Sequence, residues 1–275
     1  MNGRRAIVGV CCALLASAFV AQSASAISGT TAFTCVKDGG DKSLRGDHCL
    51  TTGTAPQEYG HVAIAQDKTT ELIATNVKTA NSTTESSVIK LKLTIAGVPI
   101  ELNATEINGA GWMENKKTAS GEHYTVNEGT ITFTGVTVKE PGGKGCKVFT
   151  HKEDGSGDPG EEGAEGTIHT RPLKGTTEGQ GDNFKYQAAD GGAYANFWLT
   201  CTTKVPTIEG TWSVAGSVRA QPVGATSTLT HAATTTENTL KCRGTKAGVE
   251  GQLTILAREN NKQAYTPVAQ TTVTT

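Results

Sequence analysis

The chain has 275 residues, of which 36% are hydrophobic and 5% aromatic, and it carries 33 glycines and a formal net charge of −1. This length suits one large domain or two modest ones. The balanced charge argues against a nucleic-acid partner, because phosphate binding requires clustered positive charge. The richness in glycine and in residues that favour strands argues against a helical bundle.

Residues 1–26 have the features of a cleaved export signal. Two arginines precede the apolar run Ala6–Val20, and Ala24-Ser25-Ala26 has the small-x-small form that signal peptidase recognises. The run is shorter than the roughly 20 apolar residues that a membrane span needs. We therefore predict cleavage before Ile27 and a secreted or extracytoplasmic bacterial protein with no membrane span after cleavage.

Five cysteines remain beyond the predicted signal, and export makes disulfides permissible. We pair Cys35 with Cys49, which closes a short polar loop and contributes about 3 kcal/mol in the chain-entropy model. The alternation around Cys146 and Cys201 places both on strands and predicts a second bridge between them, although Cys242 could replace either partner. The cysteines lack the Cys-x-x-Cys spacing of a zinc site.

Alternating apolar and polar residues predict antiparallel strands along the rest of the chain. Residues 89–95 and 98–102 alternate on either side of Ala96-Gly97 and predict a β-hairpin. Further strands are predicted at residues 129–138 with a bulge at Gly135, and at 194–200, 211–218, 227–231 and 249–255. We expect a disulfide-pinned loop region at 27–60 and an all-β domain at 61–275. The domain is predicted to be an antiparallel sandwich or barrel-like stack of about twelve strands.

Residues 152–166 are acidic and rich in glycine, which predicts a mobile surface loop. Asp154, Asp158 and Glu165 have the oxygen-donor spacing of a calcium loop. Pro159, however, occupies the position where such loops need glycine for a sharp turn. We therefore expect weak calcium binding at most, and no cofactor.

Two groups of residues are candidates for a functional site. Trp112, Tyr124 and Trp198 offer an aromatic binding surface, with Trp112 expected in a turn-like setting after the glycines that precede it. Trp212, by contrast, is expected in the core. Cys242 lies between two basic residues, and positive charge lowers the pKa of a thiol. It shares strand parity with an apolar neighbour, however, which predicts a buried and inert side chain.

The run Thr239-Leu240-Lys241-Cys242 resembles the cysteine strand of the sortase transpeptidases, with one residue missing before the cysteine. That resemblance implies a histidine and an arginine beside the thiol, for which His169, His231 and Arg258 are the candidates. It carries one of the alternative functions for this chain, that of an exported enzyme using Cys242.

The whole chain resembles a group of secreted, β-rich and functionally uncharacterised proteins of high-GC Gram-positive bacteria. The resemblance lies in the segments 111–116, 121–124, 143–146 and 246–251. It implies export and an all-β fold, and no activity. We expect a non-enzymatic binding or structural protein of the cell envelope or extracellular space, with a carbohydrate or a cell-surface protein as partner. A carrier of a small hydrophobic ligand is the second alternative, which an apolar cavity would favour.

Overall fold

The computed structural model describes residues 29–40, 42–46, 49, 53–76, 88–151, 162–177, 183–223, 226–229, 239–258 and 266–272. These residues form strands, turns and bends with no helix, so the predicted all-β antiparallel fold is confirmed. The predicted export signal lies outside them. No helix that could span a membrane occurs in the described part of the chain.

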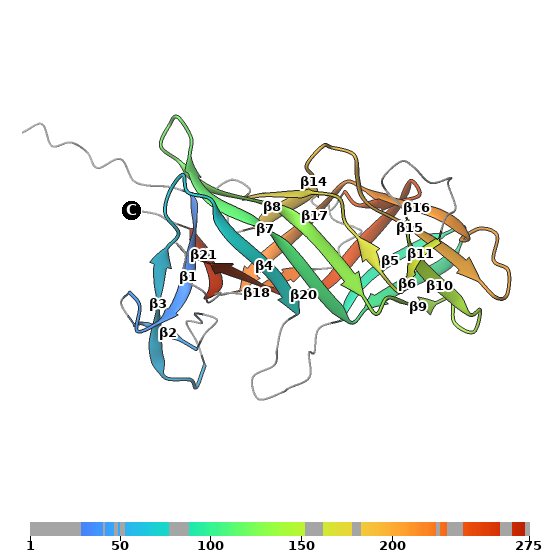
Figure 1. Cartoon of the computed structure of the whole chain (residues 1–275), viewed down its shortest axis with the longest axis horizontal. Helices are drawn as coiled ribbons and strands as arrows, with labels where there is room; N and C mark the ends of the chain where they lie inside the picture. Colours follow the sequence, from blue (N-terminus) through green and yellow to red (C-terminus); the bar gives the residue numbers. More distant parts are fainter. Residues whose placement is uncertain are drawn as a thin grey trace, which may run out of the picture.

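Eight strands form a closed antiparallel barrel at the centre of the molecule (Figure 1). Each is hydrogen-bonded to the next in chain order, and the last pairs with the first. Closure therefore leaves none of the eight as a free edge. The strands are β4 (Thr70–Asn76), β7 (Glu106–Lys117), β8 (His123–Thr134), β13 (Leu173–Thr177), β14 (Phe184–Ala188), β17 (Ser217–Val223), β18 (Thr226–Leu229) and the second half of β20 (Thr245–Arg258).

Every second connection of the barrel is expanded. Because neighbouring strands run antiparallel, the connections after β4, β8, β14 and β18 all leave the barrel at the same end. They contain β5 (Ile89–Ile95), β6 (Val98–Ala104), β9 (Thr137–Glu140), β10 (Cys146–His151), β11 (Glu162–Glu165), β12 (Ile168–His169), β15 (Ala193–Cys201), β16 (Gly210–Ala215) and β19 (Lys241–Cys242). We call these strands, with the first half of β20, the cap; β12 is the exception, because it pairs with β8 of the barrel.

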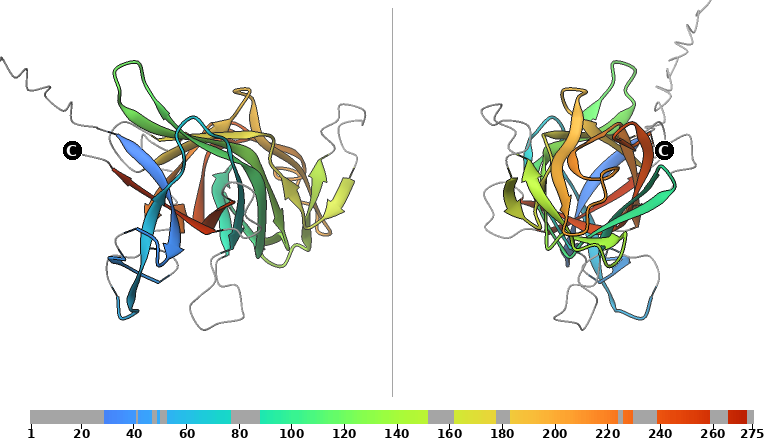
Figure 2. Two further views of the ribbon diagram at one scale, coloured as in Figure 1. Left: turned by 60° about the vertical axis from the view of Figure 1, so that its left-hand side comes forward. Right: turned by 90° about the vertical axis from the view of Figure 1, so that its right-hand side faces the viewer.

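The cap is a second curled layer that covers this end of the barrel (Figure 2). Its main strands pair in the order β9, β6, β5, β20, β19, β16, β15, β10. Gly166 joins the two ends of this series, because its N–H donates to Val148 O at 2.8 Å and its carbonyl accepts from Val136 N at 2.9 Å. β20 passes through both layers and connects them covalently.

An N-terminal arm covers the other end of the barrel (Figure 1). It consists of β1 (Thr30–Lys37), β2 (Leu44–Arg45), β3 (Gln57–Ala63) and β21 (Thr266–Thr272), and β21 pairs with both β1 and β20. The range 27–60, predicted as a loop region, thus contains strands, and β3 runs across the predicted boundary. The alternation is hidden there because Thr34 is fully buried, with its hydroxyl donating to Val62 O at 3.1 Å.

Both predicted disulfides are present, Cys35–Cys49 in the arm and Cys146–Cys201 between β10 and β15. The predicted unpaired and buried state of Cys242 is also confirmed. Disulfides persist in oxidising compartments, so the two bridges indicate an extracytoplasmic environment.

The predicted hairpin of β5 and β6 is confirmed, with Ala96 and Gly97 at φ values of 48° and 82° in its turn. Two predictions about strands were wrong. Gly135 is not a bulge, because β8 ends before it and β9 begins beyond it in the cap. Gly216 divides the strand predicted at 211–218 into β16 and β17. Both glycines have positive φ, 59° and 105°, and stand where the chain passes between barrel and cap.

The predicted loop at 152–166 is shorter than expected at its C-terminal side. Residues 162–165 form β11, which pairs with β10. The glycine at 163 lies close to Thr150, and the Thr150 hydroxyl accepts a hydrogen bond from Ala164 N at 2.6 Å. A side chain at position 163 would collide with Thr150, so glycine at this position allows β11 to lie close to β10.

Candidate ligand cavity between barrel and cap

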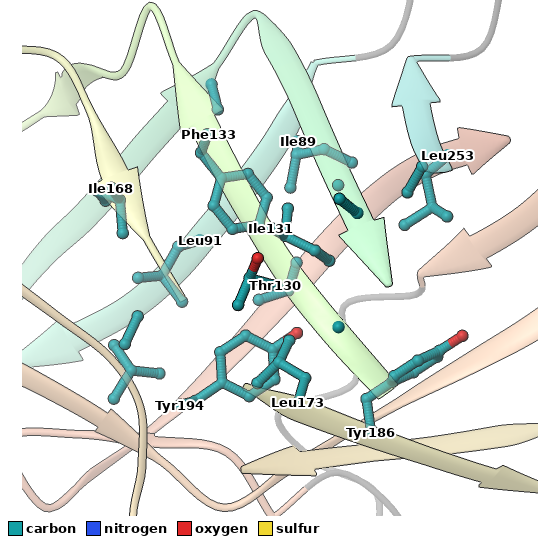
Figure 3. Close-up of a pocket in the computed structure, with 18 of the residues that line it drawn as sticks. Ile89, Leu91, Thr130, Ile131, Phe133, Ile168, Leu173, Tyr186, Tyr194 and Leu253 are labelled. Carbon is teal, nitrogen blue, oxygen red and sulfur yellow. The ribbon is translucent and has the colours of Figure 1, made fainter. Parts of the chain in front are cut away.

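The interior encloses a cavity of about 120 Å³ where the barrel meets the cap. Figure 3 shows the rings of Phe133 and Tyr194 and the side chains of Leu91 and Leu173 directed toward this space. Among the described residues, its wall is almost entirely carbon and includes no basic residue. Glu128 is the single acidic residue of this described lining, and alternation along β8 directs its side chain outward. The cavity thus offers an apolar and uncharged surface.

The cavity exists because the inward positions of β7 and β8 carry little or no side chain at this level. Gly109 and Gly129 line it, and Gly111 is the register partner of Gly129. A Cβ on Gly129 would lie 2.3 Å from Ala110 O, so the two backbones approach too closely for a side chain. Ala74 on β4 faces Gly109 and adds only a methyl group.

The barrel is filled below the cavity, toward the N-terminal arm. Met113 and Phe184 are fully buried there. Asn115 closes this end: its Nδ2 donates to Ala32 O at 2.9 Å and Ile64 O at 3.0 Å, and its Oδ1 accepts from Ala32 N at 3.0 Å. This buried amide therefore joins β1 of the arm to β7 of the barrel.

Glu128 and Thr130 occupy outward positions of β8, so two tyrosines and an asparagine supply the inward polar side chains of the described cavity wall. Asn127 Nδ2 donates to Tyr186 Oη at 3.0 Å. Burial raises the pKa of Tyr186 to about 12, and burial together with the neighbouring Tyr186 raises the pKa of Tyr194 further above its ordinary value. Both phenols are therefore neutral at physiological pH.

The structure does not bring the described members of the predicted cysteine site together. Burial raises the pKa of Cys242 to about 12, although the adjacent Arg243 opposes the shift. His169 is exposed on β12. Arg258 forms an ion pair with Glu71 at 3.1 Å, at the end of β20 opposite to the part that pairs with Cys242. At the usual rise per residue, the two ends of β20 are roughly 40 Å apart along the strand. His231 lies outside the described residues.

The aromatic candidates lie on different parts of the molecule. Trp112 and Tyr124 are on β7 and β8 of the barrel, whereas Trp198 is on β15 of the cap. The turn-like setting expected for Trp112 was wrong: the preceding glycines belong to β7 itself, where they face the barrel interior. Trp212 is fully buried and stacks on Phe197 with ring centroids 5.5 Å apart, as predicted for a core residue.

The calcium prediction concerns a segment that is only partly described. Asp154 and Asp158 lie outside the described residues, and Glu165 forms an ion pair with Lys147 at 3.1 Å. Among the residues that the structure describes, no three histidine, cysteine, aspartate or glutamate side chains are grouped as metal ligands.

No protein-family model, curated protein or solved structure matches the chain. The geometry of the cavity is therefore the basis for a functional proposal. Pattern reasoning missed the lining residues because they come from eleven strands spread along the sequence. The available signal was the set of glycines at alternate positions of β7, each of which leaves an inward position empty.

Proposed function

We propose that this protein is an extracellular binding protein that holds a small, uncharged apolar molecule in the cavity between barrel and cap. The carbon-lined cavity of about 120 Å³ carries this proposal. Ligand pockets are concave and mostly apolar, with few polar groups that fix orientation, and they occur in the mouths of β-barrels. The two disulfides and the predicted export signal support the extracellular location.

The size of the cavity supports a ligand of about six to eight non-hydrogen atoms. An engineered apolar cavity of 150 Å³ in another protein stays dry and binds benzene. An empty cavity costs stability at ≈ 24 cal/mol per Å³, which gives about 3 kcal/mol for this volume. A ligand that fills the space restores much of that energy, so the fold is poised for binding.

The two competing functions have weaker support in the geometry. A sugar-binding platform requires aromatic rings on one face, whereas Trp112 and Trp198 lie on separate sheets. An enzyme using Cys242 requires an accessible thiolate, whereas this thiol is fully buried with a raised pKa. A ligand carrier, the remaining alternative, is the one for which a preformed space exists.

Thermal unfolding in the presence of benzene tests the proposal. At ten times its dissociation constant, a ligand specific for the native state adds about 1.4 kcal/mol of stability. For a chain of this size we expect a rise in Tm of about 3–6 °C. Ala104 lines the cavity, and Ala104→Leu adds three carbons to it, so this variant should lose the benzene-dependent rise.

Ala63→Leu is the matched control, because it adds the same atoms at an exposed position of β3. It should keep the full benzene-dependent rise in Tm. Equal melting curves with and without benzene for the wild-type protein would refute the proposal. So would an undiminished rise in Ala104→Leu, since the ligand would then occupy another site.

A further inference from the structure

Tyr194 lines the cavity, and its hydroxyl has no hydrogen bond with any described residue. The Tyr186 hydroxyl, by contrast, accepts a hydrogen bond from Asn127 Nδ2 at 3.0 Å. For Tyr194, burial and the nearby Tyr186 account for the raised pKa, with no hydrogen bond among the causes. Its ring keeps some accessible surface, and it lines the cavity. The Tyr194 hydroxyl is not among the fully buried unpaired atoms of the described residues, so it keeps accessible surface through which a ligand can reach it.

A β-bulge gives Tyr194 this orientation. In the pairing of β15 with β16, Ala193 is opposite Ala215 and Ala195 is opposite Val214, so Tyr194 is the extra residue. Regular alternation would direct Tyr194 and Ala195 to opposite faces, yet both line the cavity. Bulges commonly redirect a side chain in this way and occur beside functional sites. The Tyr194 carbonyl still has a partner at the bulge, because it accepts from Arg171 N at 3.0 Å.

We infer that the ligand carries one neutral oxygen acceptor and that the Tyr194 hydroxyl donates a hydrogen bond to it. This inference rests on the proposed function. The ligand class is a small ketone, aldehyde or similar singly oxygenated hydrocarbon. A ligand with a carboxylate or an ammonium group is disfavoured, because the described lining directs no charged side chain inward to compensate that charge. The phenol stays protonated at physiological pH and so remains a donor.

Cyclohexanone and methylenecyclohexane form the test pair, since they share shape and size and differ in C=O against C=CH₂. Dissociation constants of both are measured by calorimetry for the wild-type protein and for Tyr194→Phe. Loss of the hydroxyl should weaken cyclohexanone binding roughly 10-fold, the equivalent of about 1.4 kcal/mol for a buried hydrogen bond. Methylenecyclohexane binding should change less than about 2-fold, because the Phe ring keeps the apolar contacts.

Tyr186→Phe is the matched control, since it removes the other phenol hydroxyl of the wall, whose oxygen is held by Asn127 Nδ2 at 3.0 Å. It should alter the affinities for the two ligands by the same factor. The infrared C=O stretch of cyclohexanone bound to wild-type protein gives a second readout that needs no variant. We expect it below the frequency measured in an alkane solvent.

The outcomes separate this inference from the proposed function. If neither ligand binds the wild-type protein, the proposed function fails and the inference falls with it. If both bind but Tyr194→Phe leaves their affinity ratio unchanged, or the bound carbonyl absorbs at its alkane frequency, the cavity binds apolar ligands and Tyr194 is not the donor. A selective loss of cyclohexanone affinity together with a lowered carbonyl frequency supports both.

Discussion

The two halves of the barrel have the same pairing but differ in what fills them. Near the N-terminal arm, inward positions carry Met113, Phe184 and Asn115, and all three are buried. Near the cap, glycine takes the equivalent positions of β7 and β8 and leaves a cavity. Because backbone pairing continues through both halves, it sets the shape of the barrel. Side-chain volume decides which half is core and which half can hold a ligand.

The largest difference between the halves should appear on removing a phenyl ring. Phe184→Ala in the filled half creates a new cavity and should lower the free energy of unfolding by about 3–5 kcal/mol. Phe133→Ala borders a space that already exists, so its ring gives up fewer contacts, and we expect about 1–2 kcal/mol. Denaturant unfolding of both variants measures the two losses. Equal losses would show that the half of the barrel near the cap is as closely packed as the half near the N-terminal arm.

The contact between the N-terminal arm and the barrel should depend on the side-chain amide of Asn115. Asn115→Ala leaves the backbone groups of Ala32 and Ile64 without their side-chain partner. Buried groups that lose their partners cost about 1–3 kcal/mol each, so we expect a total loss of about 2–4 kcal/mol. Amide hydrogen exchange should show faster exchange at Ala32 than in the wild-type protein. Unchanged protection of the Ala32 amide would mean that Asn115 does not hold β1 of the arm against the barrel.

Adding atoms should have opposite effects in the two halves. Ala104→Leu fills part of the cavity and should raise stability by about 0.5–2 kcal/mol. Ala220 is fully buried on β17 and does not line the cavity, so Ala220→Leu should overpack the interior and cost about 1–3 kcal/mol. Both values come from urea unfolding in the absence of ligand. A destabilised Ala104→Leu would mean that the cavity cannot accept extra volume.

The strands and disulfides were predictable because their signals are local. Alternation in β5 and β6 is strict, and a glycine-containing turn joins them, so the hairpin follows from about fifteen residues. Cys146 and Cys201 each stand in an alternating run, which placed both on strands and made them a plausible pair.

Closure of the barrel and the cavity were not predictable in this way. Closure depends on β20 pairing with β4, and Ile255 and Ala74, for example, are register partners far apart in the chain. Nothing in either strand alone specifies that partner. Gly109 and Gly111 favoured a turn because glycine is common in turns, whereas here they leave inward positions open for a ligand. Pairing had to be known before those positions could be interpreted.

A further difference between cap and cavity wall concerns titration of their buried groups at alkaline pH. Burial raises the pKa of Cys242 from 9.0 to about 12 and that of Tyr186 from 10.0 to about 12. The unfolded chain therefore releases these protons at lower pH than the folded protein does. Their contribution to stability is fully present below about pH 9 and is lost as pH rises from there toward 12.

Cys242→Ala removes the titrating group of the cap and leaves Tyr186 of the cavity wall, so it separates the two contributions to the pH dependence of stability. Between pH 9.5 and 11, the free energy of unfolding of wild-type protein should fall more steeply than that of this variant, by up to about 1.4 kcal/mol per pH unit. Urea unfolding across this range gives both slopes. The buried thiol should also react slowly with a thiol reagent at pH 8 in the native state and quickly after denaturation. Rapid native labelling that Cys242→Ser abolishes would mean that the thiol is accessible, and would restore the enzyme as the better account of this protein.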